Sequence, residues 1–192
     1  MTKKPLVSIL INNYNYGRFL RDAIDSAIHQ TYANTEVIVV DDGSTDNSKD
    51  IITGYGDKII PILKENGGQA SAFNVGFAAS RGEIILLLDS DDIFSLEKAQ
   101  EVVQVFESNS ELGWCFHPQI LIDTNKNEIF TKNYDQNLSG EYDIRPQIKR
   151  GKLHKYLPSF GLPATSGVCF RRSLLEKILP MPEADTISLS DS

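Results

Sequence analysis

Short apolar runs alternate with segments of helical periodicity along the first half of the chain, which leaves few folds open. The runs are rich in β-branched residues and cover residues 6–11, 36–40, 59–63 and 83–88. Between the first two, apolar side chains recur at helical spacing over residues 19–28 and predict an amphipathic helix. Strands separated by helices are typical of βαβ units around a mainly parallel sheet. The pattern predicts an α/β fold.

Three further helices follow from capping residues and periodicity. The first begins near Thr45 or Asp46, whose side chains can cap exposed backbone N–H groups, and the second covers residues 69–79. Ser95 caps the third, whose expected buried stripe is Leu96, Ala99, Val102, Val103 and Phe106.

The pattern changes after residue 111. Short strands are expected at 112–117, 119–122 and 128–131, the last two forming a hairpin around a polar turn at 123–127. Residues 132–162 are polar and predict a surface loop with a short helix. A late strand at 168–170 and a short helix at 173–179 complete the expected elements. The second half therefore adds a small antiparallel portion to the sheet.

Size and charge narrow the class of protein. A chain of 192 residues is one domain, and its formal net charge of −7 excludes nucleic-acid binding through phosphate contacts, which needs a basic face. Cys115 and Cys169 lack metal-ligand spacing and predict two buried thiols. The N-terminal apolar run is too short for a signal peptide or a membrane span. We expect a cytoplasmic protein, with peripheral contact to the inner face of a membrane left open.

Polar residues follow three of the four apolar runs. In an open α/β sheet, ligands bind outside the carboxyl ends of the strands, where residues 12–15, 41–46 and 89–92 are expected. Asp41 and Asp42 have two interpretations. They can shape a turn that caps the next helix, or one carboxylate can accept a hydrogen bond from a nucleotide base.

Three carboxylates, those of Asp89, Asp91 and Asp92, fall within four residues. They repel one another unless a positive charge lies between them, so this segment indicates a Mg²⁺ or Mn²⁺ site, which is favoured over a solvated acidic turn. Asn66, Gly67, Gly68 and Gln69 precede a helix. An ordinary glycine turn is favoured there over a site where backbone approaches an anion.

Taken together, these segments resemble the nucleotide-binding half of the family 2 glycosyltransferases, in order, spacing and strand context. The resemblance is carried by residues 7–15, 36–46, 74–76, 82–85, 88–92 and, later, 170–173. It implies a GT-A fold, which is a Rossmann-like, mainly parallel sheet flanked by helices. It also implies one domain over 1–192, with a nucleotide-sugar-binding half at about 1–95 and an acceptor half at about 96–192, and a family member would continue further.

The resemblance assigns roles to individual residues. The donor would be a UDP-sugar, with Tyr14 stacked on the base, Asp42 accepting from the ring N–H and Asn12 beside the base. Asp89, Ser90 and Asp91 would form the family's DXD element, with Asp91 the principal ligand of Mn²⁺ or Mg²⁺ and Asp89 near the ribose or the metal. Gln69 and Asn74 would also bind the donor. Family members often have Pro-Thr at the positions of Asn12 and Asn13 and a basic residue shortly before Asn74, and this chain departs from both patterns.

The resemblance implies an inverting, hexosyl-type transferase acting on a saccharide or glycolipid acceptor, in polysaccharide or glycolipid synthesis. Asp191 stands where the family places its general base, and Asp185 is the next candidate; the other interpretation of Asp191 is a solvated chain end. A second hypothesis is a nucleotide-sugar-binding module without turnover. A receiver domain would place its acidic pair after the first strand, and a sugar nucleotidyltransferase would have an early basic glycine-rich loop, so both fit less well.

Overall fold

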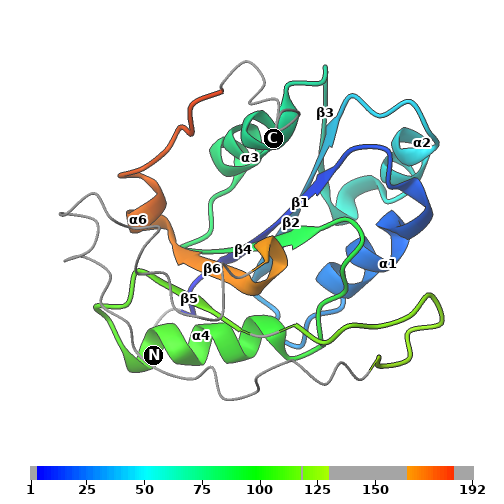
Figure 1. The fold of residues 1–192 in the computed structure, drawn as a ribbon. Coiled ribbons are helices and arrows are strands. Elements are labelled where there is room, and N and C mark those ends of the chain that lie inside the picture. Colours follow the sequence, from blue (N-terminus) through cyan, green and yellow to red (C-terminus); the bar gives the residue numbers. More distant parts are fainter. Residues whose placement is uncertain (1–3, 118, 130–163, 184–192) are drawn as a thin grey trace, which may run out of the picture.

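The computed structural model describes residues 4–117, 119–129 and 164–183, and they form a six-stranded sheet in the order β3-β2-β1-β4-β6-β5 (Figure 1). The strands are β1 (Val7–Asn13), β2 (Thr35–Asp42), β3 (Ile60–Lys64), β4 (Ile84–Asp89), β5 (Trp114–Phe116) and β6 (Val168–Arg171). The first four are parallel, whereas β6 is antiparallel to β4 and β5 is antiparallel to β6. The predicted α/β fold, with an antiparallel portion in the second half, is confirmed.

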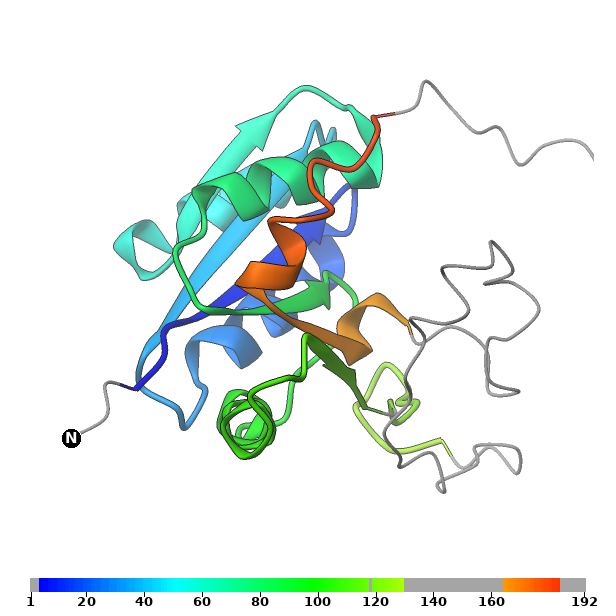
Figure 2. The ribbon, with the colours of Figure 1, turned by 90° about the vertical axis from the view of Figure 1, so that its left-hand side faces the viewer.

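Helices cover both faces of the sheet (Figure 2). The helices α1 (Gly17–Ile28), α2 (Ser48–Thr53) and α4 (Lys98–Ser108) pack on the face to which β1 contributes Val7, Ile9 and Ile11. The opposite face, with Leu10, is covered by α3 (Gly68–Ala79) and α6 (Arg172–Leu175). Two short 3-10 turns, η1 (Gly56–Lys58) and η3 (Thr165–Gly167), complete the described elements.

Several predicted boundaries were wrong. The helix α4 begins at Lys98, and Ser95 contributes its carbonyl oxygen, which accepts from the Lys98 N–H at 3.2 Å. Leu96 therefore precedes the helix and is 53% exposed, although it was predicted to be buried. The helix α2 begins at Ser48, two residues after the predicted start, but Asp46 accepts from the Ser48 N–H at 3.0 Å, as predicted for a residue at this helix end.

The described part of the second half is less regular than predicted. The turn around Asp123 forms, but its flanks are joined by a single antiparallel bridge between Ile122 and Glu128 where two strands were expected. The strand β5 and the helix α6 are both shorter than predicted. Both cysteines are free thiols, of which Cys169 is buried as predicted and Cys115 only half-buried. The predicted loop at 132–162 lies outside the described residues.

None of the helices in the described part of the chain is both long enough and apolar enough to cross a membrane.

Candidate active site

A cleft of about 340 Å³ lies at the carboxyl ends of β1, β2 and β4, beside the first turns of α3. It is lined by Asn12, Asn13, Tyr14, Tyr16, Asp42, Gln69, Ala72, Asp89, Ser90 and Asp91. This edge is where ligands of an open parallel sheet bind, because loops that leave neighbouring strands diverge there.

The alternation of side chains along the strands places three of these residues on one face of the sheet. Residues two positions apart point to the same face, and Leu10, Val40 and Leu87 all pack in the apolar cluster beneath α3. Asn12, Asp42 and Asp89 follow them by two positions. In the sheet, Asn12 is the register partner of Val40 on one side and of Asp89 on the other. The central strand thus places an amide between two carboxylates.

The two asparagines that end β1 have amide oxygens without partners among the described residues. Asn12 Oδ1 and Asn13 Oδ1 are buried and accept no hydrogen bond from the described residues. The orientation of Asn13 is fixed because its Nδ2 donates to Asp41 Oδ2 at 2.9 Å and to Ser44 Oγ at 3.1 Å. Buried acceptors are normally satisfied by protein, water or ligand, so these oxygens mark positions for a donor group at the cleft.

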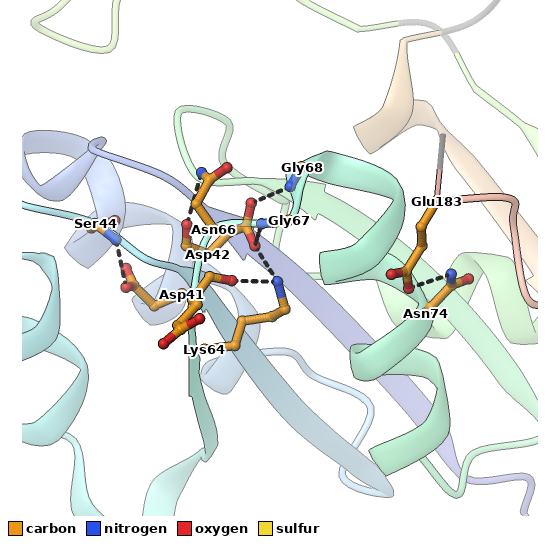
Figure 3. Close-up of polar contacts among 10 residues, drawn as sticks. Asp41, Asp42, Ser44, Lys64, Asn66, Gly67, Gly68, Asn74 and Glu183 are labelled. Atoms are coloured by element: carbon orange, nitrogen blue, oxygen red, sulfur yellow. Dashed lines mark hydrogen bonds and ion pairs between the residues drawn. The ribbon is translucent and has the colours of Figure 1, made fainter. Parts of the chain in front are cut away.

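The two residues of the acidic pair differ in their contacts: Asp41 shapes the turn, and Asp42 lines the cleft. Asp41 accepts from the Ser44 N–H at 2.9 Å and shapes the turn, as the capping interpretation predicts for one of the two residues. Asp42 is buried and faces the first residues of α3 and the end of β3 (Figure 3). Its Oδ1 accepts from Lys64 Nζ at 2.5 Å and from the Gly67 N–H at 3.0 Å, and its Oδ2 accepts from the Gly68 N–H at 2.8 Å.

The acidic segment after β4 forms a tight turn, in which the Asp92 N–H donates to the Asp89 carbonyl at 3.1 Å. The Asp89 N–H donates to Ser166 Oγ at 2.8 Å, so η3 holds the end of β4 in place. Burial, together with the negative charges of Asp92 and Asp91, raises the pKa of Asp89 to about 6. Repulsion from the neighbouring carboxylates, which the sequence predicts, is thus the second cause of the raised pKa after burial.

The residues present fit a divalent cation held together with a phosphate ligand. Within the described ranges, no three His, Cys, Asp or Glu side chains are arranged to enclose a metal by themselves. Mg²⁺, however, is commonly held by one or two carboxylates, waters and substrate phosphates. Asp89 and Asp91 line the same cleft, and a cation would relieve the repulsion that raises the pKa of Asp89.

Burial of Asp89, together with this repulsion, predicts a pH-dependent effect of Asp89→Asn on the metal-free protein. The pKa of Asp89 is about 6 in the folded state, against 3.8 for the unperturbed group, so the folded state binds its proton more tightly. As pH rises through this window, ionisation of Asp89 lowers the free energy of unfolding, and the loss persists above pH 6. We expect Asp89→Asn, which cannot ionise, to be more stable relative to the parent at pH 7 than at pH 4.

Denaturant unfolding in EDTA at both pH values measures this difference. Asp57→Asn, at an exposed acid in η1, is the matched control for the loss of one carboxylate. An effect of Asp89→Asn that is equal at pH 4 and pH 7 would contradict the prediction.

Aromatic and polar groups complete the rim. Tyr14 and Tyr16 are 49% and 45% exposed, and both line the cleft, so their ring faces are available to a flat ligand. Gln69 is the second residue of α3, and Ser90, which lies between Asp89 and Asp91 in sequence, is buried.

Asn74, a predicted donor-binding residue, is not among the residues that line the cleft. Its Nδ2 donates to the Met181 carbonyl at 2.9 Å, and its Oδ1 accepts from the Met181 N–H at 2.8 Å. Nδ2 also contacts Glu183 Oε1 at 3.2 Å (Figure 3). Asn74 thus holds the chain after α6 against α3. Asp191 and Asp185 lie outside the described residues.

Sequence reasoning missed four residues of the site: Asn13, Tyr16 and Ala72 in the lining, and Lys64 behind Asp42. Lys64 could have been found, because it ends β3 at the same sheet edge at which Asp42 ends β2. Asn13 is the last residue of β1 and Tyr16 lies in the polar segment that follows, whereas Ala72 has no polar atom in its side chain.

Relatives and solved structures agree with this architecture. An uncharacterised glycosyltransferase of Nostoc sp. is 40% identical over 182 residues, which is 91% of this chain and 53% of that protein. Glycosyltransferase GlyG of Streptococcus pneumoniae is 36% identical over 115 residues, covering 56% of this chain and 38% of GlyG. The chain thus spans about half or less of the length of these relatives.

Two solved structures share the fold at low identity. TarS 1–349 of Staphylococcus aureus in complex with UDP-GlcNAc has a TM-score of 0.63 and 20% identity, covering 90% of this chain and 47% of its own. The mannosyltransferase PcManGT of Pyrobaculum calidifontis in complex with GDP-Man and Mn²⁺ has the same TM-score and identity, covering 95% and 49%.

The parallel sheet with its antiparallel extension agrees with the GT-A fold of these neighbours, and the relatives are named as glycosyltransferases. The glycosyl transferase family 2 model matches residues 8–179, which is most of the domain. The chain belongs to glycosyltransferase family 2 and has the GT-A fold.

Proposed function

We propose that the cleft binds the nucleoside diphosphate of a UDP-sugar and that the protein transfers the sugar to an acceptor hydroxyl with inversion. The proposal rests on one observation: the two ends of the cleft, here called its poles, differ in their chemistry. Asp42 and Tyr14 form a pole suited to a base, and Asp89 and Asp91 form an acidic pole suited to a metal-bound diphosphate. Asn12 lies between them at the end of the central strand.

The residues of the base pole bind and orient the nucleoside. The Tyr14 ring stacks on the base, and Asp42 accepts from the ring N–H. Asn12 Oδ1, which is buried and without a partner among the described residues, accepts a hydrogen bond beside the base. Gln69 and Ser90 are further polar residues of the lining, and they contact the remainder of the donor.

Asp91 and Asp89 would hold Mn²⁺ or Mg²⁺ at the acidic pole. The cation supplies charge neutralisation of the nucleoside diphosphate as it leaves the sugar. The carboxylates of this chain present hard oxygen ligands to that ion, and the Ser166 hydroxyl, by accepting from the Asp89 N–H, fixes the backbone that carries them.

Asp191 acts as the general base in this proposal. It removes the proton of the acceptor hydroxyl, whose oxygen attacks the anomeric carbon from the face opposite the departing diphosphate. The acceptor is a saccharide or glycolipid of a polysaccharide or glycolipid pathway, by analogy with the family.

A thermal-shift screen of UDP- and GDP-sugars with and without Mn²⁺ tests the donor site, because ligands that bind the folded state raise Tm by mass action. A sugar-transfer assay on the same samples tests turnover. A Mn²⁺-dependent shift together with transfer supports the enzyme, and a shift without transfer to any acceptor or to water supports a binding module. No shift with any nucleotide sugar would contradict the proposed donor site.

Asp42→Asn is expected to weaken UDP binding by about 10- to 100-fold, because a hydrogen bond to a charged acceptor is lost and the amide satisfies its neighbours poorly. Calorimetry with UDP and with pyrophosphate separates the base from the diphosphate, and pyrophosphate affinity should change little. Tyr14→Ala should also weaken the binding of UDP, because the ring that stacks on the base is lost. Asp57→Asn is the charge-matched control, and equal affinities of Asp42→Asn and the parent for UDP would restrict Asp42 to a structural role.

A further inference from the structure

We propose that Lys64 is a specificity-determining residue, which leaves Asp42 a single vacant acceptor position and so favours uracil over guanine. The inference rests on the proposed function, because it concerns the base of the donor bound in the same cleft. The fold alone does not determine which base the donor carries, because TarS 1–349 is solved with UDP-GlcNAc and PcManGT with GDP-Man.

The hydrogen bonds of Asp42 can be counted. An ionised carboxylate offers about four acceptor positions, two on each oxygen. Lys64 Nζ and the Gly67 N–H fill both positions on Oδ1, and the Gly68 N–H fills one on Oδ2. One position remains, on Oδ2, and Asp42 is one of the residues that line the cleft.

Lys64 is held where it can act in this way. It ends the edge strand β3 beside Asp42, its register partner in β2. Its Nζ donates to Asp42 Oδ1 and to the Glu65 carbonyl, at 2.6 Å for the latter, and the two charged side chains are only 18% and 6% exposed. A buried pair with little access to water holds its geometry, since each charge loses its partner if it moves.

The single vacant position matches some bases and not others. Uracil presents one ring N–H between two carbonyl groups, so one acceptor satisfies it. Guanine presents a ring N–H beside an amino group, and these two donors require two acceptors when they are withdrawn from water. Cytosine and adenine present an unprotonated ring nitrogen, which a carboxylate repels. A guanine base in this cleft therefore leaves a donor without a partner, a costly arrangement at a buried site.

Removing the Lys64 ammonium opens a second position, on Oδ1. We expect Lys64→Met to shift the ratio of UDP to GDP affinity toward GDP, on the order of tenfold. The ratio is the informative quantity. A general loosening of the cleft, or the loss of a positive charge near the diphosphate, weakens both nucleotides alike and cancels.

Calorimetry with UDP, GDP and CDP in Mn²⁺ measures the ratio for the parent and its variants. Lys64→Arg keeps a cationic donor at Asp42 and should restore the parent ratio, whereas CDP should bind weakly throughout. Lys126→Met is the matched control, since Lys126 is paired with Asp22 at 2.8 Å and is not among the residues of the cleft. If Lys64→Met does not fold, Lys64→Ala opens the same position with a smaller side chain.

The outcomes separate the inference from the proposed function. A parent that prefers UDP, with an unchanged ratio in Lys64→Met, overturns the role of Lys64 and leaves the donor site standing. A parent that prefers GDP also overturns the proposed role of Lys64. A parent that binds neither nucleotide contradicts the proposed function, and the inference fails with it.

Discussion

Asp91→Ala is expected to abolish the Mn²⁺-dependent part of UDP binding. Asp89 and Asp91 are the two carboxylates that line the acidic end of the cleft, so the variant loses half of the protein's proposed carboxylate ligands. Changes to residues that merely support a metal ligand cost about 10- to 100-fold in metal affinity, and loss of a direct ligand should reach at least the upper end of that range. Calorimetric titration with UDP in Mn²⁺ and in EDTA isolates the metal-dependent part.

Asp92→Ala is the matched control for charge. Asp92 is adjacent in sequence, but its Oδ2 accepts from Gln119 Nε2 at 3.1 Å, and it is not in the lining of the cleft. It should retain most of the Mn²⁺-dependent affinity. Equal losses in the two variants would point to general electrostatics, and an unchanged Mn²⁺ dependence in Asp91→Ala would refute the metal assignment.

Asp191→Asn is expected to reduce sugar transfer by about 10² or more while UDP affinity stays nearly intact. General-base catalysis contributes this much because proton removal from the acceptor hydroxyl occurs in the transition state, after the donor is bound. Steady-state turnover and UDP calorimetry on a protein that transfers sugar provide the two readings. Asp185→Asn serves as the comparison, and a large loss there with normal turnover in Asp191→Asn would move the base to Asp185.

The parallel half of the fold was predictable because its signals are local. The runs that became β1 to β4 and the stripe of α1 are repeated apolar spacings, which need no knowledge of distant residues. Local signals failed to predict where a helix begins when a good capping residue lies upstream of the true start. Ser95 is a good cap by residue type, yet α4 begins three residues later, and Leu96 is left exposed.

The cleft was predictable to the extent that it follows from strand ends. Asn12, Asp42 and Asp89 were identified because each ends or follows an apolar run at one edge of a parallel sheet. Asn74 was assigned by family analogy alone, and its contact with Met181 spans 107 residues, which no local pattern reveals. The Ser166 contact with Asp89 spans 77 residues and was missed for the same reason.

The reversed direction of β6 makes the acidic turn depend on a residue that is translated much later. Because β6 runs antiparallel to β4, its amino end lies beside the carboxyl end of β4, and η3 delivers Ser166 to the acidic turn. During synthesis, β1 to β4 are translated before η3 and β6. Ser166, whose hydroxyl accepts from the Asp89 N–H, is translated 77 residues after Asp89. The residues of the base pole and of the acidic turn are thus all translated before Ser166, which holds the end of β4 in place.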